Sequence, residues 1–222
     1  MNVIGINGSP RKGWNTHILI GEALKGAASR GAETELINLY DLNFKGCISC
    51  FECKRKGGPS LGRCVVKDEL RPVLDKIDAC DAFFLGSPIY IGELSASMRA
   101  LIERLTFQYI SYEKDRKPHF TRRVPVGLIY TMNIPEAGLD QAGYTAKFQA
   151  YEGLFSHIFG LSKTLRSTET WQTEDYGKYG ITMVSEADRK KRRKEVFPQD
   201  CGKAFELGAE LTPGAEKGME DT

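Results

Sequence analysis

Short apolar runs that alternate with amphipathic stretches restrict the fold of this 222-residue chain more than any other feature. Apolar runs predict strands at residues 3–7, 81–87 and 124–132, an alternating pattern predicts one at 33–39, and a more polar strand is predicted at 163–171. Apolar residues at helical spacing predict helices at residues 16–31, 68–78, 95–107, 143–160 and 185–211, the last broken or kinked at Pro198. Strands interleaved with helices in this way form a parallel sheet with helices on both faces. The chain is therefore expected to be an α/β protein.

The composition is that of a globular protein with one packed core, since 41% of the residues are hydrophobic and 27% are charged. We expect residues 1–211 to form a single domain with a cysteine-rich loop at 46–64, and residues 212–222 to form a flexible polar tail. The 31 basic and 29 acidic residues nearly cancel, which leaves a formal charge of +2. Such a chain offers no electrostatic reason to bind nucleic acid or an anionic membrane, so neither is expected as a partner.

The N-terminal stretch "MNVIGINGSPRKG" has no charged leader, no long apolar segment and no small-residue cleavage site, and it is typical of a first strand. No other run is long and apolar enough to span a bilayer. We therefore expect a cytoplasmic protein, in which thiols stay reduced. The six cysteines are then more compatible with free, ligating or redox-active thiols than with structural disulfides.

The turn after the first strand, "GSPRKGWNTHI", is suited to binding an anion. Backbone N–H groups at a helix N-terminus form such a site when hydroxyls and a cation lie beside them. The candidate residues are Ser9, Arg11, Asn15 and Thr16. The alternative is an ordinary turn in which Asn15 or Thr16 caps the helix.

The same turn nearly matches a P-loop, but two of the required residues are absent. Trp14 and Asn15 stand where a P-loop has its phosphate-binding lysine and its magnesium-binding hydroxyl. The Gly-x-Gly-x-x-Gly fingerprint of dinucleotide sites is absent as well. The turn is therefore suited to a terminal monophosphate bound without a metal.

A second candidate loop, "GSPIYIGELSASMRALIER" (86–104), follows the third strand. It should lie beside the first turn at the carboxyl edge of the sheet, where open α/β sheets bind ligands. Pro88 fixes a turn, and the residues that follow, Ile89, Tyr90 and Ile91, offer a flat apolar wall for an aromatic ligand. The alternative is a Tyr–Ile pair that packs into the core under the loop.

Four of the six cysteines are gathered in "GCISCFECKRKGGPSLGRC" (46–64), with the spacing Cys47-x2-Cys50-x2-Cys53-x10-Cys64. Four thiolates suffice for a cubane iron–sulfur cluster or for a closed zinc site. The same spacing is compatible with reduced or redox-active thiols and, in an oxidising compartment, with a stapled loop. Zinc sites usually use paired C-x2-C knuckles, whereas this loop has a triplet plus one.

Together, "GSPRKGWNT" and "GSPIYIGELSASMRALIER" resemble the NADPH-dependent FMN reductase family of flavodoxin-like proteins, and the cysteine loop resembles its iron–sulfur flavoprotein branch. The resemblance covers about residues 1–110 and is only general beyond them. It implies a doubly wound five-stranded parallel sheet of order 2-1-3-4-5. It also implies an FMN whose phosphate sits on the four candidate residues of the first turn, Ser9, Arg11, Asn15 and Thr16.

In this family the isoalloxazine ring would lie against residues 88–92, which are Pro88, Ile89, Tyr90, Ile91 and Gly92. A third flavin loop should follow the fourth strand. The family often has a Gly-rich stretch there, but this chain has "TMNIPEAG" (131–138), so the resemblance carries less weight for Thr131, Met132 and Asn133.

The iron–sulfur branch implies a 4Fe–4S cluster on Cys47, Cys50, Cys53 and Cys64. The first three cysteines match the pattern of the branch, but the last gap, of ten residues, is longer. Flavin-only relatives carry similar cysteines, so reduced thiols remain an alternative to the cluster. The cysteine loop follows the second strand, so we expect it to lie near the flavin.

The resemblance implies an FMN-dependent oxidoreductase that takes electrons from NAD(P)H or a reduced carrier protein and passes them to an acceptor. The flavin carries out the redox chemistry, so no side chain is expected to act as a catalyst. The alternative function is a colourless zinc-dependent interaction module. We also expect a homodimer or homotetramer, because the helix at 95–107 has more apolar surface than one sheet face covers. The basic run "RKKRRK" (189–194) is interpreted as a solvated or interface face.

Overall fold

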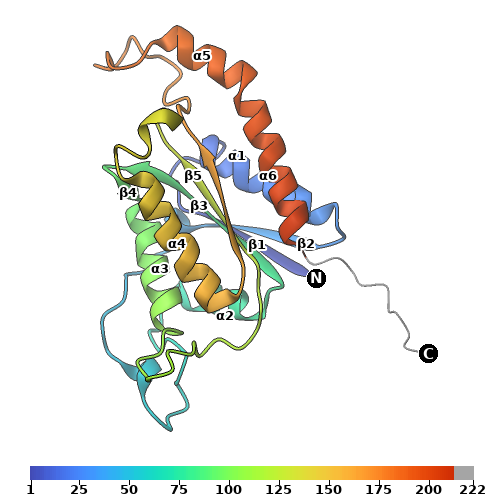
Figure 1. Ribbon diagram of the computed structural model, residues 1–222, viewed down its shortest axis with the longest axis vertical. Coiled ribbons are helices and arrows are strands. Elements are labelled where there is room, and N and C mark those ends of the chain that lie inside the picture. Colours follow the sequence, from blue (N-terminus) through green and yellow to red (C-terminus); the bar gives the residue numbers. More distant parts are fainter. Residues whose placement is uncertain (213–222) are drawn as a thin grey trace, which may run out of the picture.

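The computed structural model describes residues 1–212 and shows a parallel sheet between two layers of helices (Figure 1). The strands of the parallel sheet are β1 (Asn2–Asn7), β2 (Glu33–Asn38), β3 (Ala82–Tyr90), β5 (Val126–Thr131) and β6 (Ser162–Ser167). The helices are α1 (Asn15–Ala28), α2 (Arg71–Ala79), α3 (Ala96–Phe107), α4 (Tyr144–Phe159), α5 (Glu186–Glu195) and α6 (Phe197–Leu211). None of these helices is both long enough and apolar enough to cross a membrane.

The predicted sheet is confirmed, because its parallel strands run in the order β2-β1-β3-β5-β6, which is 2-1-3-4-5 when only these five are counted. The sequence did not predict β4 (Glu93–Leu94), which pairs antiparallel with the end of β3. β3 is correspondingly longer than predicted and runs to Tyr90. It forms with β4 a hairpin that projects from the carboxyl edge of the sheet.

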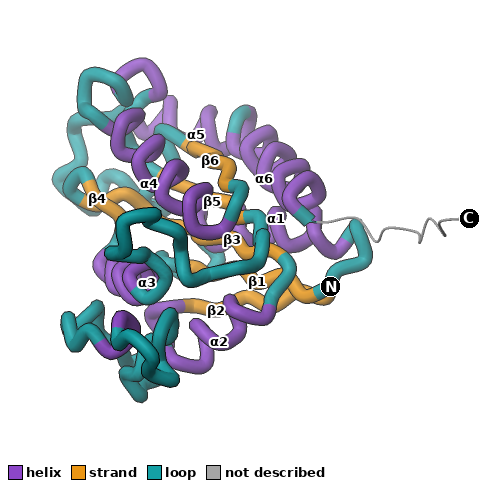
Figure 2. Tube along the Cα trace, turned by 60° about the horizontal axis from the view of Figure 1, so that its bottom comes forward, coloured by secondary structure: helices purple, strands orange, loops and turns teal. Residues whose placement is uncertain are grey.

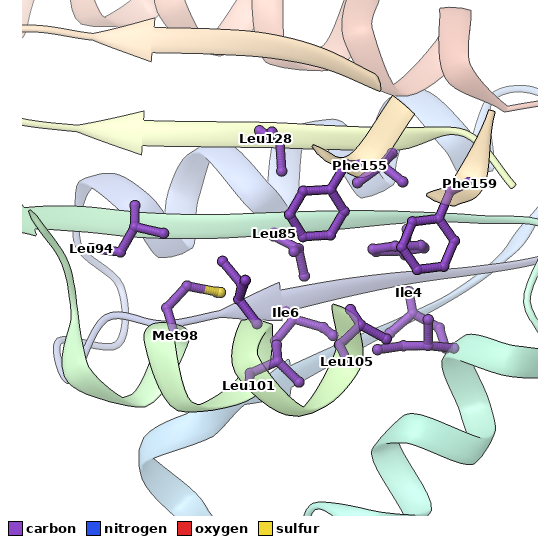
Figure 3. Close-up of a cluster of buried hydrophobic side chains, with 14 of the residues drawn as sticks. Ile4, Ile6, Leu85, Leu94, Met98, Leu101, Leu105, Leu128, Phe155 and Phe159 are labelled. Atoms are coloured by element: carbon purple, nitrogen blue, oxygen red, sulfur yellow. The ribbon is translucent and has the colours of Figure 1, made fainter. Parts of the chain in front are cut away.

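Helices lie on both faces of the sheet (Figure 2), and each face has its own apolar core. The larger core lies between the sheet and α2, α3 and α4, and in Figure 3 side chains such as Ile6, Leu101 and Phe155 meet there. The smaller core lies between the sheet and helices α1 and α6. Continuous apolar strands such as β3 are explained by this burial on both faces.

Helices α1 and α6 pack at backbone contact through two glycines. A Cβ added at Gly26 would lie 1.9 Å from the carbonyl oxygen of Phe205, and one at Gly208 would lie 1.8 Å from that of Ala23. No larger residue fits at either position without separating the helices. This contact fixes α6 against α1. It also fixes the position of α5, which directly precedes α6.

Two predicted boundaries are wrong. Helix α2 begins at Arg71 and not at Asp68, because Pro72 is tolerated only in the first turn. The carboxylate of Asp68 instead forms an ion pair with Arg104. Thr212 is also not part of a tail, since it is buried and its hydroxyl donates to the carbonyl oxygen of Gly208. The rest of the predicted tail, 213–222, lies outside the described residues.

The structure removes the argument for an oligomer from helix α3. Its apolar side chains are buried within the chain's own core, apart from the half-buried Phe107, and they are Met98, Leu101, Ile102 and Leu105. The sheet and the chain segments around it cover this face completely, so it offers no surface for a second copy.

Asp78, at the end of α2, gives the fold a predicted pH dependence. Burial raises the pKa of this carboxyl to about 6, against the opposing charge of Arg71. A folded pKa above the unfolded one means that the protonated carboxyl adds stability at low pH, and that this contribution is lost as pH rises through 6. Asp78→Asn, which cannot ionise, should therefore gain stability over the wild type as pH rises from about 4.5 to about 7.5.

The measurement is the urea midpoint of both proteins at the two pH values. Asp75→Asn is the matched control, because the hydrogen bond from Arg71 lowers the pKa of Asp75. Loss of the Asp75 carboxylate should therefore destabilise the folded protein at neutral pH. If Asp78→Asn and the wild type keep the same difference in midpoint across this range, Asp78 is not ionising as described.

Candidate functional site

A cleft at the carboxyl ends of β1, β3 and β5 brings together ten of the twelve residues predicted to bind the flavin. The ten are Ser9, Arg11, Asn15, Thr16, Pro88, Ile89, Tyr90, Thr131, Met132 and Asn133. They come from the turn after β1 and the start of α1, from the end of β3, and from the end of β5 with the residues that follow it. The loops meet because parallel strands end at the same edge of the sheet.

The N-terminus of α1 faces this cleft with unpaired donors. The backbone N–H groups of Asn15, Thr16 and His17 have no acceptor among the hydrogen bonds of the described residues. The N-cap residue, Trp14, makes no side-chain cap. Four such N–H groups are left without a partner inside any α-helix, and together with the helix dipole they favour an anion.

The side chains of Asn15 and Thr16 are engaged within the protein, so they do not act as simple caps. The Asn15 amide donates to the carbonyl oxygen of Trp171 at 2.7 Å. The Thr16 hydroxyl lies 2.7 Å from the hydroxyl of Thr131. These contacts tie the first loop to the third and to the segment after β6. They leave the backbone N–H groups of the loop for a ligand.

Arg11 is held at the rim of the cleft by two contacts. Its guanidinium stacks over Trp14, 3.3 Å from the ring centroid, and donates to the carbonyl oxygen of Gln172 at 2.5 Å. A guanidinium has five N–H donors, so this hydrogen bond leaves others for an anion. The Ser9 hydroxyl accepts from the Arg11 amide at 3.1 Å, which fixes the turn between them.

Two predicted flavin residues, Ile91 and Gly92, lie outside the lining of the cleft. They form the tip of the β3–β4 hairpin with φ angles of 49° and 78°, and Ile91 is fully exposed. A two-residue hairpin with both φ angles positive points its tip away from the sheet. Lys147 of α4 holds the hairpin by donating to the carbonyl oxygen of Gly92 and to Glu93.

The cleft also contains residues that the sequence did not reveal. The additional lining residues are Trp14, Thr170, Trp171 and Gln172. The last three follow β6, whose end lies at the same edge as the other loops. The sequence could have indicated this loop, because the loop that follows a fifth parallel strand must lie at the same edge of the sheet as the others. The strand predicted at 163–171 ends at Ser167 in the structure. The prediction therefore assigns residues 168–171 to the strand and misses the loop.

The arginines of helix α5 bind residues of the cleft from behind its lining and do not form a solvated basic face. Arg193 donates to the side-chain oxygen of Asn15 at 2.9 Å, and Arg189 donates to Asn133 and Glu169. Arg192 pairs with buried Asp200. The lysines of the same run remain exposed. The solvated-face prediction for 189–194 is therefore wrong for its arginines.

Because Arg193 holds Asn15 at the start of α1, we expect Arg193→Gln to weaken binding of a phosphorylated flavin. The loss should be about tenfold, since a hydrogen bond to a charged group contributes roughly 1.5–3 kcal/mol. The measurement is a fluorescence titration of the apoprotein with FMN. Lys194→Gln is the control for charge, because Lys194 is the exposed neighbour on the same helix. Equal losses in both variants would mean that Arg193 acts only through long-range charge.

The four cysteines of the 46–64 loop line one cavity with residues of α3. Cys53 is buried, Cys64 is half-buried, and Cys47 and Cys50 are exposed. The rest of the lining is Ile48, Phe51, Val65, Val66, Arg104, Phe107 and Gln108. The ten-residue gap folds back on itself, because the amide of Gly62 donates to the carbonyl oxygen of Cys53 at 2.9 Å. The longer gap is therefore compatible with four sulfurs around one cavity.

One buried and one half-buried cation, Arg104 and Lys54, lie near these thiols. Burial raises the pKa of the Cys53 thiol, while the nearby Lys54 opposes that rise. Arg104 has no exposed side-chain surface. Among residues 1–212, no three His, Cys, Asp or Glu side chains lie close enough to hold a single metal ion. The buried Nε of Arg104 and Nε2 of Gln108 have no partner within residues 1–212, so the cavity has two donors available to a bound acceptor.

The cysteine cavity does not adjoin the flavin-type cleft, which corrects the expectation that the two are close. They share no lining residue. The turn that begins the cleft contacts the start of α3, where the Ser95 hydroxyl donates to the carbonyl oxygen of Gly8, whereas Arg104 and Phe107 at the end of α3 line the cysteine cavity. Figure 1 shows the 46–64 loop beyond that end of α3. A twelve-residue helix is about 18 Å long. The two sites are separated because the segment 42–46 runs along α3 and places the cysteines beyond the edge of the sheet.

Comparisons with known proteins find similar chains among the iron–sulfur flavoproteins. An iron–sulfur flavoprotein of Methanocaldococcus jannaschii is 42% identical over 104 residues, which cover 47% of this chain and 51% of that protein. The chain thus spans about half the length of that relative. An iron–sulfur flavoprotein of Methanosarcina thermophila is 27% identical over 194 residues, which cover 86% of this chain and 93% of that protein.

A solved NAD(P)H:quinone oxidoreductase of Methanothermobacter marburgensis has the same fold, with a TM-score of 0.69 at 15% identity over 95% of this chain and 98% of that one. A family model described as NADPH-dependent FMN reductase matches residues 1–145. Since this match spans more than half of the 222 residues, the chain belongs to the NADPH-dependent FMN reductase family.

Proposed function

We propose that the protein is an FMN-dependent oxidoreductase that passes electrons from NAD(P)H or a reduced carrier protein to an acceptor. A 4Fe–4S cluster on the four cysteines would serve as its second redox centre. The observation that carries the proposal is the cleft in which three loops bring an anion site and an apolar wall together. Membership of the reductase family and the names of the two relatives support it.

The residues of the cleft fit FMN. The free N–H groups at the start of α1, with Arg11 beside them, would bind the phosphate. Pro88, Ile89 and Tyr90 would lie against the ring and exclude water from one face. Burial raises the pKa of Tyr90, which keeps its phenol neutral at physiological pH. Bound FMN supplies the redox chemistry, and the chain supplies binding and orientation.

The four thiols would bind the cluster through Cys47, Cys50, Cys53 and Cys64. Such a cluster carries single electrons. A reducing compartment such as the cytoplasm would keep the ligands available. The alternative, a zinc-dependent interaction module, gives the cleft no role, so we do not propose it.

The electron donor and acceptor would be small molecules or proteins. The exposed side chains next to the cleft, Tyr40, Tyr90 and Ile91, would be covered in a homodimer or homotetramer. Light scattering at high protein concentration tests this assembly, and a monomer would contradict it.

The reductase role is tested with anaerobically purified protein that receives NADPH, NADH or a reduced ferredoxin in separate cuvettes. At least one donor should bleach the flavin absorbance with about one electron pair per flavin. Free FMN with the same donors gives the background rate. If FMN stays bound and none of the donors reduces it faster than this background, the proposed function is wrong.

A further inference from the structure

Arg104 is a fully buried cation at the cysteine cavity, and one of its donors is unused. Its side chain has 0% exposed surface and forms an ion pair with Asp68. Its terminal nitrogens donate to Asp68 and to the backbone carbonyl oxygens of Lys45 and Val66. Its Nε has no partner among the described residues. The two carboxylate oxygens of Asp68 accept from a terminal nitrogen of Arg104 and from the amide of Leu70, and neither accepts from Nε.

Gln108 repeats the pattern one turn later on the same face. It is 1% exposed, and its Oε1 accepts from the amide of Cys64 at 2.8 Å. That contact fixes the orientation of the side-chain amide, since Nε2 cannot accept from an N–H group. Nε2 is buried and has no partner among residues 1–212. Gln108 therefore orients a cysteine and also offers a free donor.

Both side chains line the cavity of the four cysteines, whose remaining lining is apolar. Buried donors in native proteins are nearly always paired, so two orphans beside one cavity indicate an acceptor inside it. Sulfur atoms that carry negative charge would satisfy both residues.

We infer that Arg104 and Gln108 donate N–H···S hydrogen bonds to an iron–sulfur cluster on the four cysteines and raise its reduction potential. The inference rests on the proposed function. Reduction adds an electron to the cluster, so nearby donors and a permanent positive charge stabilise the reduced form more than the oxidised form. Both are positioning residues, since neither ligates iron.

Gln108→Glu tests the inference with little change of shape. Its carboxylate still accepts from the amide of Cys64 but no longer donates. Arg104→Lys keeps the charge and removes the Nε donor. Gln149→Glu makes the same charge change on an exposed position of α4 and is the matched control. Each protein is reconstituted with ferrous iron and sulfide, and iron is counted before an EPR-monitored titration at about pH 8.5, well above the ordinary glutamate pKa.

Gln108→Glu should lower the equilibrium constant for one-electron reduction of the cluster at least tenfold, or about 59 mV. Arg104→Lys should lower it in the same direction, and Gln149→Glu should leave it unchanged. The flavin potential should not move in any variant. If both cavity variants keep the wild-type cluster potential, the inference is wrong although the cluster stands.

Wild-type protein that takes up no iron would instead overturn the cluster part of the proposed function. If a variant fails to fold, the wild type still decides the matter. With isotopically labelled guanidine nitrogens, the reduced cluster should show a magnetic coupling to arginine nitrogen. The absence of that coupling in iron-loaded protein would also overturn the inference.

Discussion

Cys64→Ser is expected to remove most of the iron from the protein and to leave FMN bound. Cys64 comes from the far end of the 46–64 loop, where the amide of Cys64 is held by Gln108. Loss of one of four thiolates leaves a cubane without a protein ligand at one iron, whereas the flavin-type cleft shares no lining residue with this cavity. Iron, sulfide and flavin are measured per chain after anaerobic purification.

Cys201→Ser is the matched control, because Cys201 is half-buried like Cys64 but lies on α6, outside the cavity. It should keep both iron and FMN. If Cys64→Ser keeps the wild-type iron content and spectrum, Cys64 does not ligate a cluster, and the alternative of free or redox-active thiols replaces it.

Arg11→Ala is expected to weaken FMN binding by about tenfold to a hundredfold while changing riboflavin binding little. The guanidinium lies beside the free N–H groups of α1, and a charge-assisted contact to phosphate contributes roughly 1.5–3 kcal/mol. Riboflavin has no phosphate, so it should not sense this loss. The measurement is the ratio of the dissociation constants for FMN and riboflavin, determined for the wild-type apoprotein and for the variant apoprotein.

Lys12→Ala controls for the positive charge of the loop, because Lys12 is the next residue and pairs with Asp41 at the surface. It should change the ratio much less than Arg11→Ala does. Equal affinity of the wild type for FMN and riboflavin would remove the phosphate site altogether.

Most of the fold could be predicted because its signals are local. Three of the five parallel strands, β1, β3 and β5, are continuous apolar runs, and Ser95 and Ser185 cap helices near the predicted boundaries. The β3–β4 hairpin could not be predicted, since its turn is Ile91-Gly92, in which Ile91 replaces the first residue of the Asn-Gly or Gly-Gly signal of such turns. The start of α2 was misjudged because Asp68 pairs with a residue that is distant in sequence.

The candidate site could be predicted only where each loop carries its own pattern. The first turn and the "GSPIYIG" loop did so, and they line the cleft together. Arg193 could not be found, because its contact with Asn15 spans 178 positions and depends on the packing of α6 against α1. The distance between the two cavities was missed for a similar reason. The loop begins at the carboxyl edge of the sheet, but that edge does not determine where the cysteines lie after the extended segment along α3.

The most direct test of the account is the flavin and iron content of wild-type protein purified without oxygen. We predict about one FMN and about four iron atoms per chain, with an absorbance spectrum that combines flavin and cluster. Acid release of the flavin would identify it as FMN by its phosphate. A colourless protein that also fails to bind added FMN would contradict the central claim.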